Sequence, residues 1–379
     1  MLSQDNINKV YPDQGRRFFV AMSGGVDSSV AALLLKQQGY YVVGVYMKNW
    51  SEPVLGRQCP WERDQEDARR AAEKLDIPFY TFDFEKEYKA EVVNYMIREY
   101  QAGRTPNPDV ICNKIIKFGL FLDKALALGA DYIATGHYAR KRELKVKNSK
   151  LKVFELMSGI DKQKDQTYFL WTLTQDQLRH CIFPIGDFTK QEIRAIAKQA
   201  GLPTAGKPDS QGVCFIGEFS MQDFLKQYIP IHKGDVVAAS GRKVGEHQGA
   251  SFYTIGQRHG IGIGGGMPYY VSAKDIDSNT LTVAEGSEDI SLFKSELDAR
   301  DVNWISGKMP SFPLRCQARI RYRQPLQPCR VEKLETRNSK IEIIRIFFDQ
   351  PQRAITPGQS VVFYDDNGEL MLGGGVIDS

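Results

Sequence analysis

The chain has 379 residues, of which 42% are hydrophobic and 25% charged, a composition typical of folded globular domains. The formal net charge of +4 is too small by itself to indicate nucleic-acid binding, and six cysteines are too few for a disulfide-rich secreted scaffold. No apolar run approaches the roughly 20 residues that span a bilayer, and the N-terminus lacks the apolar stretch of a signal peptide. We therefore expect two or three domains, a cytoplasmic location and no membrane partner.

The first part of the chain alternates strand-like and helix-like segments. Apolar β-type runs occupy 18–22, 41–47, 77–84 and 131–135, and helical spacing occupies 28–38, 64–75, 86–102 and 107–128. Asn107 and Pro108 have the residue types of an N-cap and a first helical position. This β-α-β-α order predicts a Rossmann-like α/β domain with a parallel sheet covered on both faces.

The remainder changes in character. We expect a hairpin at 140–157, a helix at 166–181 and a helix from Thr189, whose capping box Glu192 completes. Residues 203–217 resemble a loop. Short β-type runs follow at 251–255, 268–273, 279–284, 316–323, 341–348 and 360–364. The predicted domains are an α/β domain at 1–217, a small central β-rich domain at 218–295 and a C-terminal β-barrel domain at 296–379.

Ser23-Gly24-Gly25-Val26-Asp27-Ser28-Ser29 lies between a predicted strand and a predicted helix. Glycines let the backbone approach an anion closely, and the N–H groups at a helix start favour a phosphate. Asp27 would repel a phosphate unless a cation intervenes, which implies Mg²⁺ with the nucleotide and no dedicated metal site. The alternative is a simple glycine turn between strand and helix.

These residues resemble the PP-loop motif SGGxDS, whose enzymes cleave ATP between the α and β phosphates and adenylate a substrate oxygen. The motif leaves several substrates open, among them xanthylate, citrulline, nicotinate adenine dinucleotide and a tRNA nucleobase. Taken alone, Met47 is more typical of a core residue than of an adenine contact. The resemblance implies that ATP contacts Ala21, Met22, Ser23, Gly24, Gly25, Val26, Asp27, Ser28, Met47 and Gly136.

Two cysteines lie in segments suited to chemistry. Cys112 falls within the first turns of the helix predicted from Asn107, where the helix N-terminus favours a thiolate. Asp109 is a candidate proton-transfer group beside it. Cys214 lies in a loop of small residues. Each is also compatible with a buried small hydrophobe, the interpretation we keep for Cys59, Cys181, Cys316 and Cys329. Their spacing does not suggest a zinc site.

Several blocks occur in the order found in tRNA-specific 2-thiouridylases, the MnmA/TrmU family: the phosphate loop, PNPDVICN, ATGHYAR, KDQTYFL, DSQGVCFIG and TIGQRHGIGIGG. The chain is similar to that family over about residues 18–375. The resemblance implies that ATP adenylates O2 of the wobble uridine (position 34) of tRNAs for Lys, Glu and Gln. It further implies that Cys214 carries a persulfide, that Cys112 releases its sulfur, and that a transient Cys112–Cys214 disulfide remains. A cysteine desulfurase or sulfur relay protein would supply the persulfide.

Basic residues are unevenly distributed. Residues 302–331 contain six Lys or Arg and no acidic residue, and residues 140–150 contain six against Glu143. Such clusters suit phosphates, although a solvated edge strand has the same composition. By resemblance, Asn107, Pro108 and Asp109 meet the target base. The resemblance also implies tRNA contacts at His137, Lys164, Asp165, Gln166, Arg321, Tyr322 and Gln359.

Two competing interpretations remain. A PP-loop enzyme with a small-molecule substrate would need neither the paired cysteines nor the basic β region. An RNA-binding module would not need an intact phosphate loop. Gly260–Gly265 matches G-x-G-x-x-G, yet it opens no predicted helix, and a hairpin turn is the better interpretation there.

Overall fold

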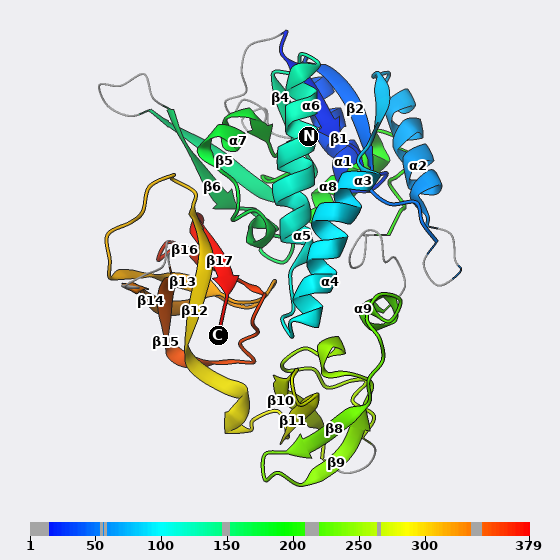
Figure 1. Ribbon diagram of the computed structural model, residues 1–379. Coiled ribbons are helices and arrows are strands. Elements are labelled where there is room, and N and C mark those ends of the chain that lie inside the picture. Colours follow the sequence, from blue (N-terminus) through cyan, green and yellow to red (C-terminus); the bar gives the residue numbers. More distant parts are fainter. Residues whose placement is uncertain are drawn as a thin grey trace.

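The computed structural model describes residues 15–53, 56, 59–145, 152–208, 220–263, 267–334 and 343–379. Figure 1 shows three regions: an α/β region at the top of the view, a barrel at the lower left and a small sheet at the bottom. The predicted fold class, a Rossmann-like α/β domain followed by β-rich regions and a C-terminal barrel, is confirmed.

The α/β region is built on a parallel sheet in the order β3-β2-β1-β4-β7. Alternate residues of β1 enter opposite layers: Phe18 and Val20 pack with the helices at Val26–Gln37, Trp61–Lys74 and Lys190–Gln199, whereas Phe19 and Ala21 face the helices that follow β3. The strands are β1 (Arg17–Ala21), β2 (Tyr41–Lys48), β3 (Phe79–Asp83), β4 (Tyr132–Thr135) and β7 (Cys181–Ile182).

The helices of this region begin close to where the sequence predicts them. Thr189 caps α8, its hydroxyl and the Glu192 carboxylate forming the predicted capping box over the buried Ile193 and Ile196. The bounds are α1 (Val26–Gln37), α2 (Trp61–Lys74), α3 (Glu85–Tyr88), α4 (Asn94–Gln101), α5 (Pro108–Ile111), α6 (Phe121–Ala127), α7 (Gln175–His180) and α8 (Lys190–Gln199), with π-helical stretches at Lys89–Val93 and Cys112–Leu120.

The predicted helix at 166–181 is wrong. A 3-10 turn at Thr167–Phe169 and the short α7 occupy that segment. Tertiary contacts override the helical spacing, because the Tyr168 hydroxyl donates to the Ser360 carbonyl (2.9 Å) and the Trp171 indole donates to the Ser360 hydroxyl (3.0 Å). Both contacts hold this part of the segment against the barrel.

A small mixed sheet forms the central region, in the order β10-β11-β8-β9, after α9 (Met221–Leu225). The predicted strand at 251–255 is wrong, because a 3-10 turn covers Ala250–Phe252 after Gly249, whose φ is +142°. The strands are β8 (Gly234–Ala238), β9 (Lys243–His247), β10 (Tyr269–Asp275) and β11 (Thr280–Glu285), followed by a 3-10 turn at Ile290–Leu292.

The C-terminal barrel follows the order β12-β15-β14-β13-β16-β17 and closes by pairing of β12 with β17. The predicted hairpin of β5 (Ala139–Lys145) and β6 (Lys152–Ser158) extends this sheet, because β6 pairs with β17. Figure 1 shows the hairpin reaching from the α/β region toward the barrel. The barrel strands are β12 (Phe293–Trp304), β13 (Leu314–Arg319), β14 (Gln327–Leu334), β15 (Ile343–Arg353), β16 (Ser360–Tyr364) and β17 (Leu370–Ile377).

Candidate active site

The phosphate loop connects the carboxyl end of β1 to the start of α1. Gly25 caps that helix without a side-chain bond, so its first N–H groups are free to meet an anion. The Ser28 hydroxyl folds back over the loop, accepting from the Ser23 N–H (3.1 Å) and donating to the Gly25 carbonyl (3.2 Å). The sequence-predicted strand-loop-helix context is therefore present.

Two glycines allow other backbone segments to approach this loop. Gly24 has a φ of +75°, and a Cβ there would collide with the carbonyl of Asp64. A Cβ on Gly136, just after β4, would lie 2.7 Å from the Ser28 nitrogen and 2.9 Å from the Asp27 carbonyl carbon. Gly136 thus lies against the first turn of α1, beside the loop.

Asp27 has partners that the sequence analysis missed. The Lys190 ammonium contacts both carboxylate oxygens (2.7 and 2.8 Å), and the Tyr138 hydroxyl donates to one of them (2.8 Å). Lys190 therefore neutralises the carboxylate that would otherwise repel a phosphate. Among the described residues, no group of three or more His, Cys, Asp or Glu side chains is placed to hold a metal ion.

Met47 lies near the carboxyl end of β2, opposite Phe82 of β3, and is partly buried against the core. Its neighbour Lys48 pairs with Glu85 (2.9 Å) and lies over the Trp61 ring. The side chain of Met47 is thus at the sheet edge where a ligand of an open α/β sheet binds, while it also contributes to packing.

Cys112 lies one turn into a helix that Asn107 begins. The Asn107 side chain accepts from the Val110 N–H (3.4 Å), and Pro108 occupies the first helical position, as predicted. The Cys112 side chain is buried, with 5% exposure, so reaction with a second sulfur requires a partner brought close to it. Cys214, by contrast, lies outside the described residues, as does the rest of 209–219.

Asp109 is in the same helical turn and is only partly exposed. Burial raises the pKa of its carboxyl above the ordinary range, and the positive charge of Lys117 acts in the opposite direction. A raised pKa brings a carboxyl closer to neutral pH, which suits a group that exchanges protons with a substrate.

Three of the residues expected to contact tRNA make internal contacts in the structure: His137, Asp165 and Gln166. His137 is buried beside Phe118 and Phe183, and its Nδ1 meets the Thr135 hydroxyl at 2.8 Å. Burial lowers the pKa of His137 well below its usual value, and Lys117 lowers it further.

Asp165 is also buried, accepting from the Thr167 hydroxyl (2.9 Å) and lying 3.8 Å from the Arg319 guanidinium. The Gln166 side chain accepts from the Tyr138 N–H (3.0 Å). Lys164, in the same segment, donates its backbone N–H to the Asp161 carbonyl (3.0 Å). The segment 164–167 is therefore fixed by internal hydrogen bonds.

Arg321 and Tyr322 lie where the barrel meets the other two regions. The Arg321 Nη2 donates to the carbonyls of Ile255 (3.2 Å) and Ala354 (2.8 Å). Tyr322 packs on Phe169, with ring centroids 4.6 Å apart, and the Arg323 guanidinium lies over the Tyr322 ring, 5.1 Å from its centroid.

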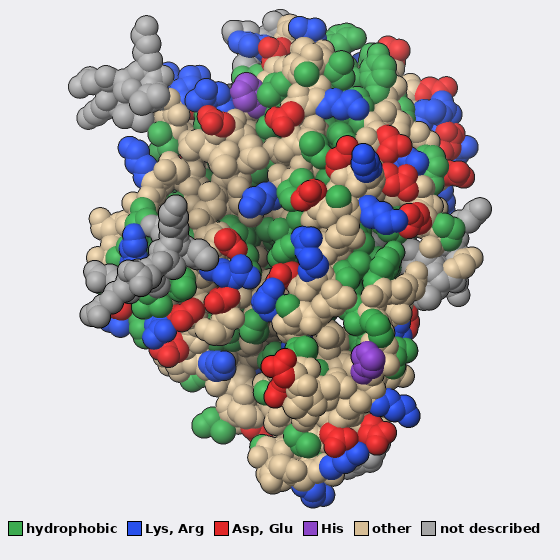
Figure 2. Space-filling model, in the orientation of Figure 1, with side chains coloured by type: hydrophobic (Ala, Val, Ile, Leu, Met, Phe, Trp, Pro, Cys, Tyr) green, Lys and Arg blue, Asp and Glu red, His purple; other side chains and the backbone are tan. Residues whose placement is uncertain are grey.

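In the folded chain, ion pairs with acidic residues neutralise part of the positive charge of the basic segments 302–331 and 140–150. Arg315 forms a bidentate pair with Asp349 (2.9 Å to each oxygen), and Arg330 pairs with Glu332 (3.0 Å). In the hairpin, the Lys141 ammonium donates to the Leu178 carbonyl (2.9 Å). Figure 2 shows Lys and Arg interspersed with acidic side chains over the visible face, without one continuous basic patch.

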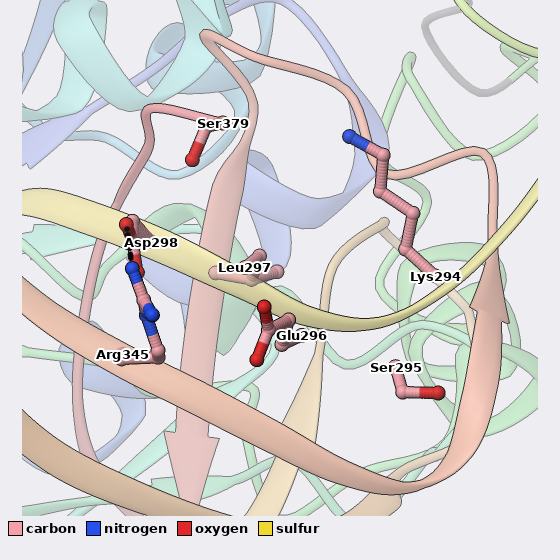
Figure 3. Close-up of a pocket in the computed structure, with 7 residues that line it drawn as sticks. All are labelled: Lys294, Ser295, Glu296, Leu297, Asp298, Arg345 and Ser379. Atoms are coloured by element: carbon pink, nitrogen blue, oxygen red, sulfur yellow. Dashed lines mark hydrogen bonds and ion pairs between the residues drawn. The ribbon is translucent and has the colours of Figure 1, made fainter.

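The other cysteines agree with a packing role. Cys181, Cys316 and Cys329 are buried, and Cys59 is partly exposed. A hollow on the barrel lies away from the phosphate loop, and the bidentate pair of Arg345 with Asp298 (2.7 and 2.9 Å) forms part of its lining, as Figure 3 shows. In the part of the chain that the structure describes, no helix is long and apolar enough to cross a membrane.

Fold and loop together define the chain as a HUP-type protein with a PP-loop. The family model described as tRNA methyl transferase HUP domain matches residues 16–218, tRNA methyl transferase PRC-barrel domain matches 222–285, and Aminomethyltransferase beta-barrel domain matches 294–377. The HUP family with this loop uses ATP.

Curated relatives specify the family further. The tRNA-specific 2-thiouridylase MnmA of Geobacillus thermodenitrificans is 51% identical over 96% of this chain and 94% of its own length. The tRNA-specific 2-thiouridylase MnmA of Streptococcus thermophilus is 49% identical over 96% of this chain and 95% of its own length. That of Francisella philomiragia is 47% identical over 96% of this chain and 99% of its own length. The chain belongs to the tRNA-specific 2-thiouridylase family.

Proposed function

We propose that the chain is an ATP-dependent tRNA-uridine 2-sulfurtransferase acting at the wobble position of tRNA in the cytoplasm. The observation that carries the proposal is the coexistence, in one α/β region, of an intact phosphate loop and of Cys112 near the start of a capped helix. Membership of the 2-thiouridylase family supports the tRNA substrate. The acceptor tRNAs for Lys, Glu and Gln remain part of the proposal.

The first stage activates the uridine. The loop from Ala21 to Ser28 holds the phosphates of ATP, and the uridine O2 attacks the α phosphorus so that pyrophosphate leaves. Lys190 keeps Asp27 neutralised while negative charge accumulates at the loop. Mg²⁺ bound with ATP would neutralise the phosphate oxygens and assist departure of pyrophosphate.

The second stage transfers sulfur. The terminal sulfur of a Cys214 persulfide attacks C2 of the adenylated uridine, and AMP leaves. The Cys112 thiolate then attacks the Sγ of Cys214, breaking the bond to the transferred sulfur and releasing 2-thiouridine. A Cys112–Cys214 disulfide results, which an external dithiol reduces. Asp109, whose raised pKa fits proton exchange, is the candidate proton carrier. A persulfide-carrying desulfurase or relay protein reloads Cys214.

Pyrophosphate release tests the activation stage. We expect release with ATP and unmodified tRNA carrying uridine at the wobble position. We expect none with the same tRNA carrying cytidine there. Release that is independent of tRNA but stimulated by a small carboxylate or amide substrate would instead indicate a small-molecule PP-loop enzyme. Binding of tRNA with no ATP turnover would favour an RNA-binding module.

A further inference from the structure

The segment Gly103–Pro106 connects α4 to the Asn107 cap and therefore sets where the helix with Asp109 and Cys112 begins. It is held by contacts from both later regions of the chain. Figure 1 shows α4 and α5 extending from the α/β region toward the barrel and the small sheet. Thr105 is buried, with 6% exposure.

We call the contacts that hold Gly103–Pro106 the clamp. The barrel contributes hydrogen bonds to it. The Gln359 Nε2 donates to the carbonyls of Thr105 (2.9 Å) and Pro106 (3.1 Å). The Thr105 N–H donates in return to the Pro357 carbonyl (2.8 Å). Gly358, at a φ of +90°, permits this approach, since a Cβ there would lie 2.9 Å from the Thr105 carbonyl oxygen.

The central region closes the clamp from the other side. The Thr254 hydroxyl meets the Thr105 hydroxyl at 3.2 Å, and a Cβ on Gly103 would lie 2.5 Å from Ile276. Arg321 ties the two gripping regions together through the carbonyls of Ile255 and Ala354. The segment is therefore held by Thr254 and Ile276 of the central region and by residues 357–359 of the barrel, all distant from it in sequence.

Gln359 is half-buried, and both protons of its amide nitrogen are used by the clamp. We propose that Gln359 is a positioning residue: through Thr105 and Pro106 it fixes the start of the helix that carries Cys112. The expected effect on the rate of 2-thiouridine formation rests on the proposed function. The proposal assigns the barrel a role in catalytic geometry as well as in RNA recognition.

The test replaces Gln359 by leucine, which keeps the volume and removes the donors, and compares it with Gln350→Leu, an exposed glutamine of the same barrel. We expect Gln359→Leu to lower the single-turnover rate of 2-thiouridine formation at saturating tRNA by about 10-fold or more, because small displacements of reacting groups have large kinetic effects. The rate of Gln350→Leu should match that of the wild type. A raised Kd for tRNA with an unchanged rate at saturating tRNA would overturn the proposal in favour of a direct tRNA contact.

Amide hydrogen exchange of the peptide 103–112 gives a readout independent of activity. We expect faster exchange there in Gln359→Leu and, less strongly, in Thr254→Val, with no change in Gln350→Leu. Thr254→Val carries the test if Gln359→Leu does not fold, and wild-type exchange and rate in that variant would then refute the clamp. If the wild-type protein forms no 2-thiouridine, the proposed function fails, while the exchange result still decides whether the clamp exists.

Discussion

Replacement of Lys190 by methionine would leave the Asp27 carboxylate at the phosphate loop without its positive partner and should weaken ATP binding. The Lys190 side chain is 12% exposed and that of Asp27 31%, so the pair is partly screened from water. At an effective dielectric constant of about 20, a carboxylate about 5 Å from a phosphate charge repels it by about 3 kcal/mol, or about 100-fold in affinity. Solvent around Asp27 reduces this, and we expect ATP to bind about 10-fold to 100-fold more weakly.

Isothermal titration of ATP measures this effect, with Lys198→Met as the control because Lys198 is exposed on the same helix. Added Mg²⁺ should restore part of the lost affinity by supplying the missing positive charge. The double variant Asp27→Asn with Lys190→Met removes the carboxylate as well and should recover most of the remainder. An ATP affinity of Lys190→Met within about twofold of Lys198→Met would refute the reasoning, since an uncompensated charge at the loop has to be felt.

Three further predictions concern the same site. Cys112→Ser and Cys214→Ser should each abolish 2-thiouridine formation while leaving tRNA affinity in a filter-binding assay unchanged; an active Cys214→Ser enzyme would remove the persulfide role. Gly136→Ala places a Cβ 2.7 Å from the Ser28 nitrogen and should weaken ATP binding measurably, whereas Gly206→Ala, where a Cβ meets open space, should not. Asp109→Asn should lower the thiolation rate and flatten its fall toward acidic pH. Burial raises the pKa of Asp109 in the folded protein, so its ionisation destabilises the fold once the pH exceeds the pKa that Asp109 has in the unfolded chain. The variant should therefore melt no lower than the wild type at pH 7.

Local signals in the sequence predicted local structure well. The Asn107-Pro108 start of α5 and the Thr189 capping box depend on residues three or four positions apart, and both are present. The phosphate loop was predictable for the same reason. Segments whose side chains dock on distant elements were not, as the failed helix at 166–181 shows through Tyr168 and Trp171.

Long-range partners account for what the sequence did not reveal about the site. Lys190 meets Asp27 across 163 positions, and neither residue type nor spacing marks the pair. Acidic residues outside 302–331 neutralise part of that basic run, as Asp349 does for Arg315. The domain boundaries at 217 and 295 and the individual tRNA contacts stay predictions.

The central claim, transfer of sulfur to a tRNA uridine, is tested most directly by analysis of the product nucleosides. The protein is incubated with ATP, Mg²⁺, a persulfide donor, a dithiol reductant and unmodified tRNA, and the digested RNA is examined by mass spectrometry. We predict 2-thiouridine in amounts that depend on ATP and exceed those of the Cys112→Ser control. An absence of 2-thiouridine from a folded protein that binds both ATP and tRNA would contradict the account.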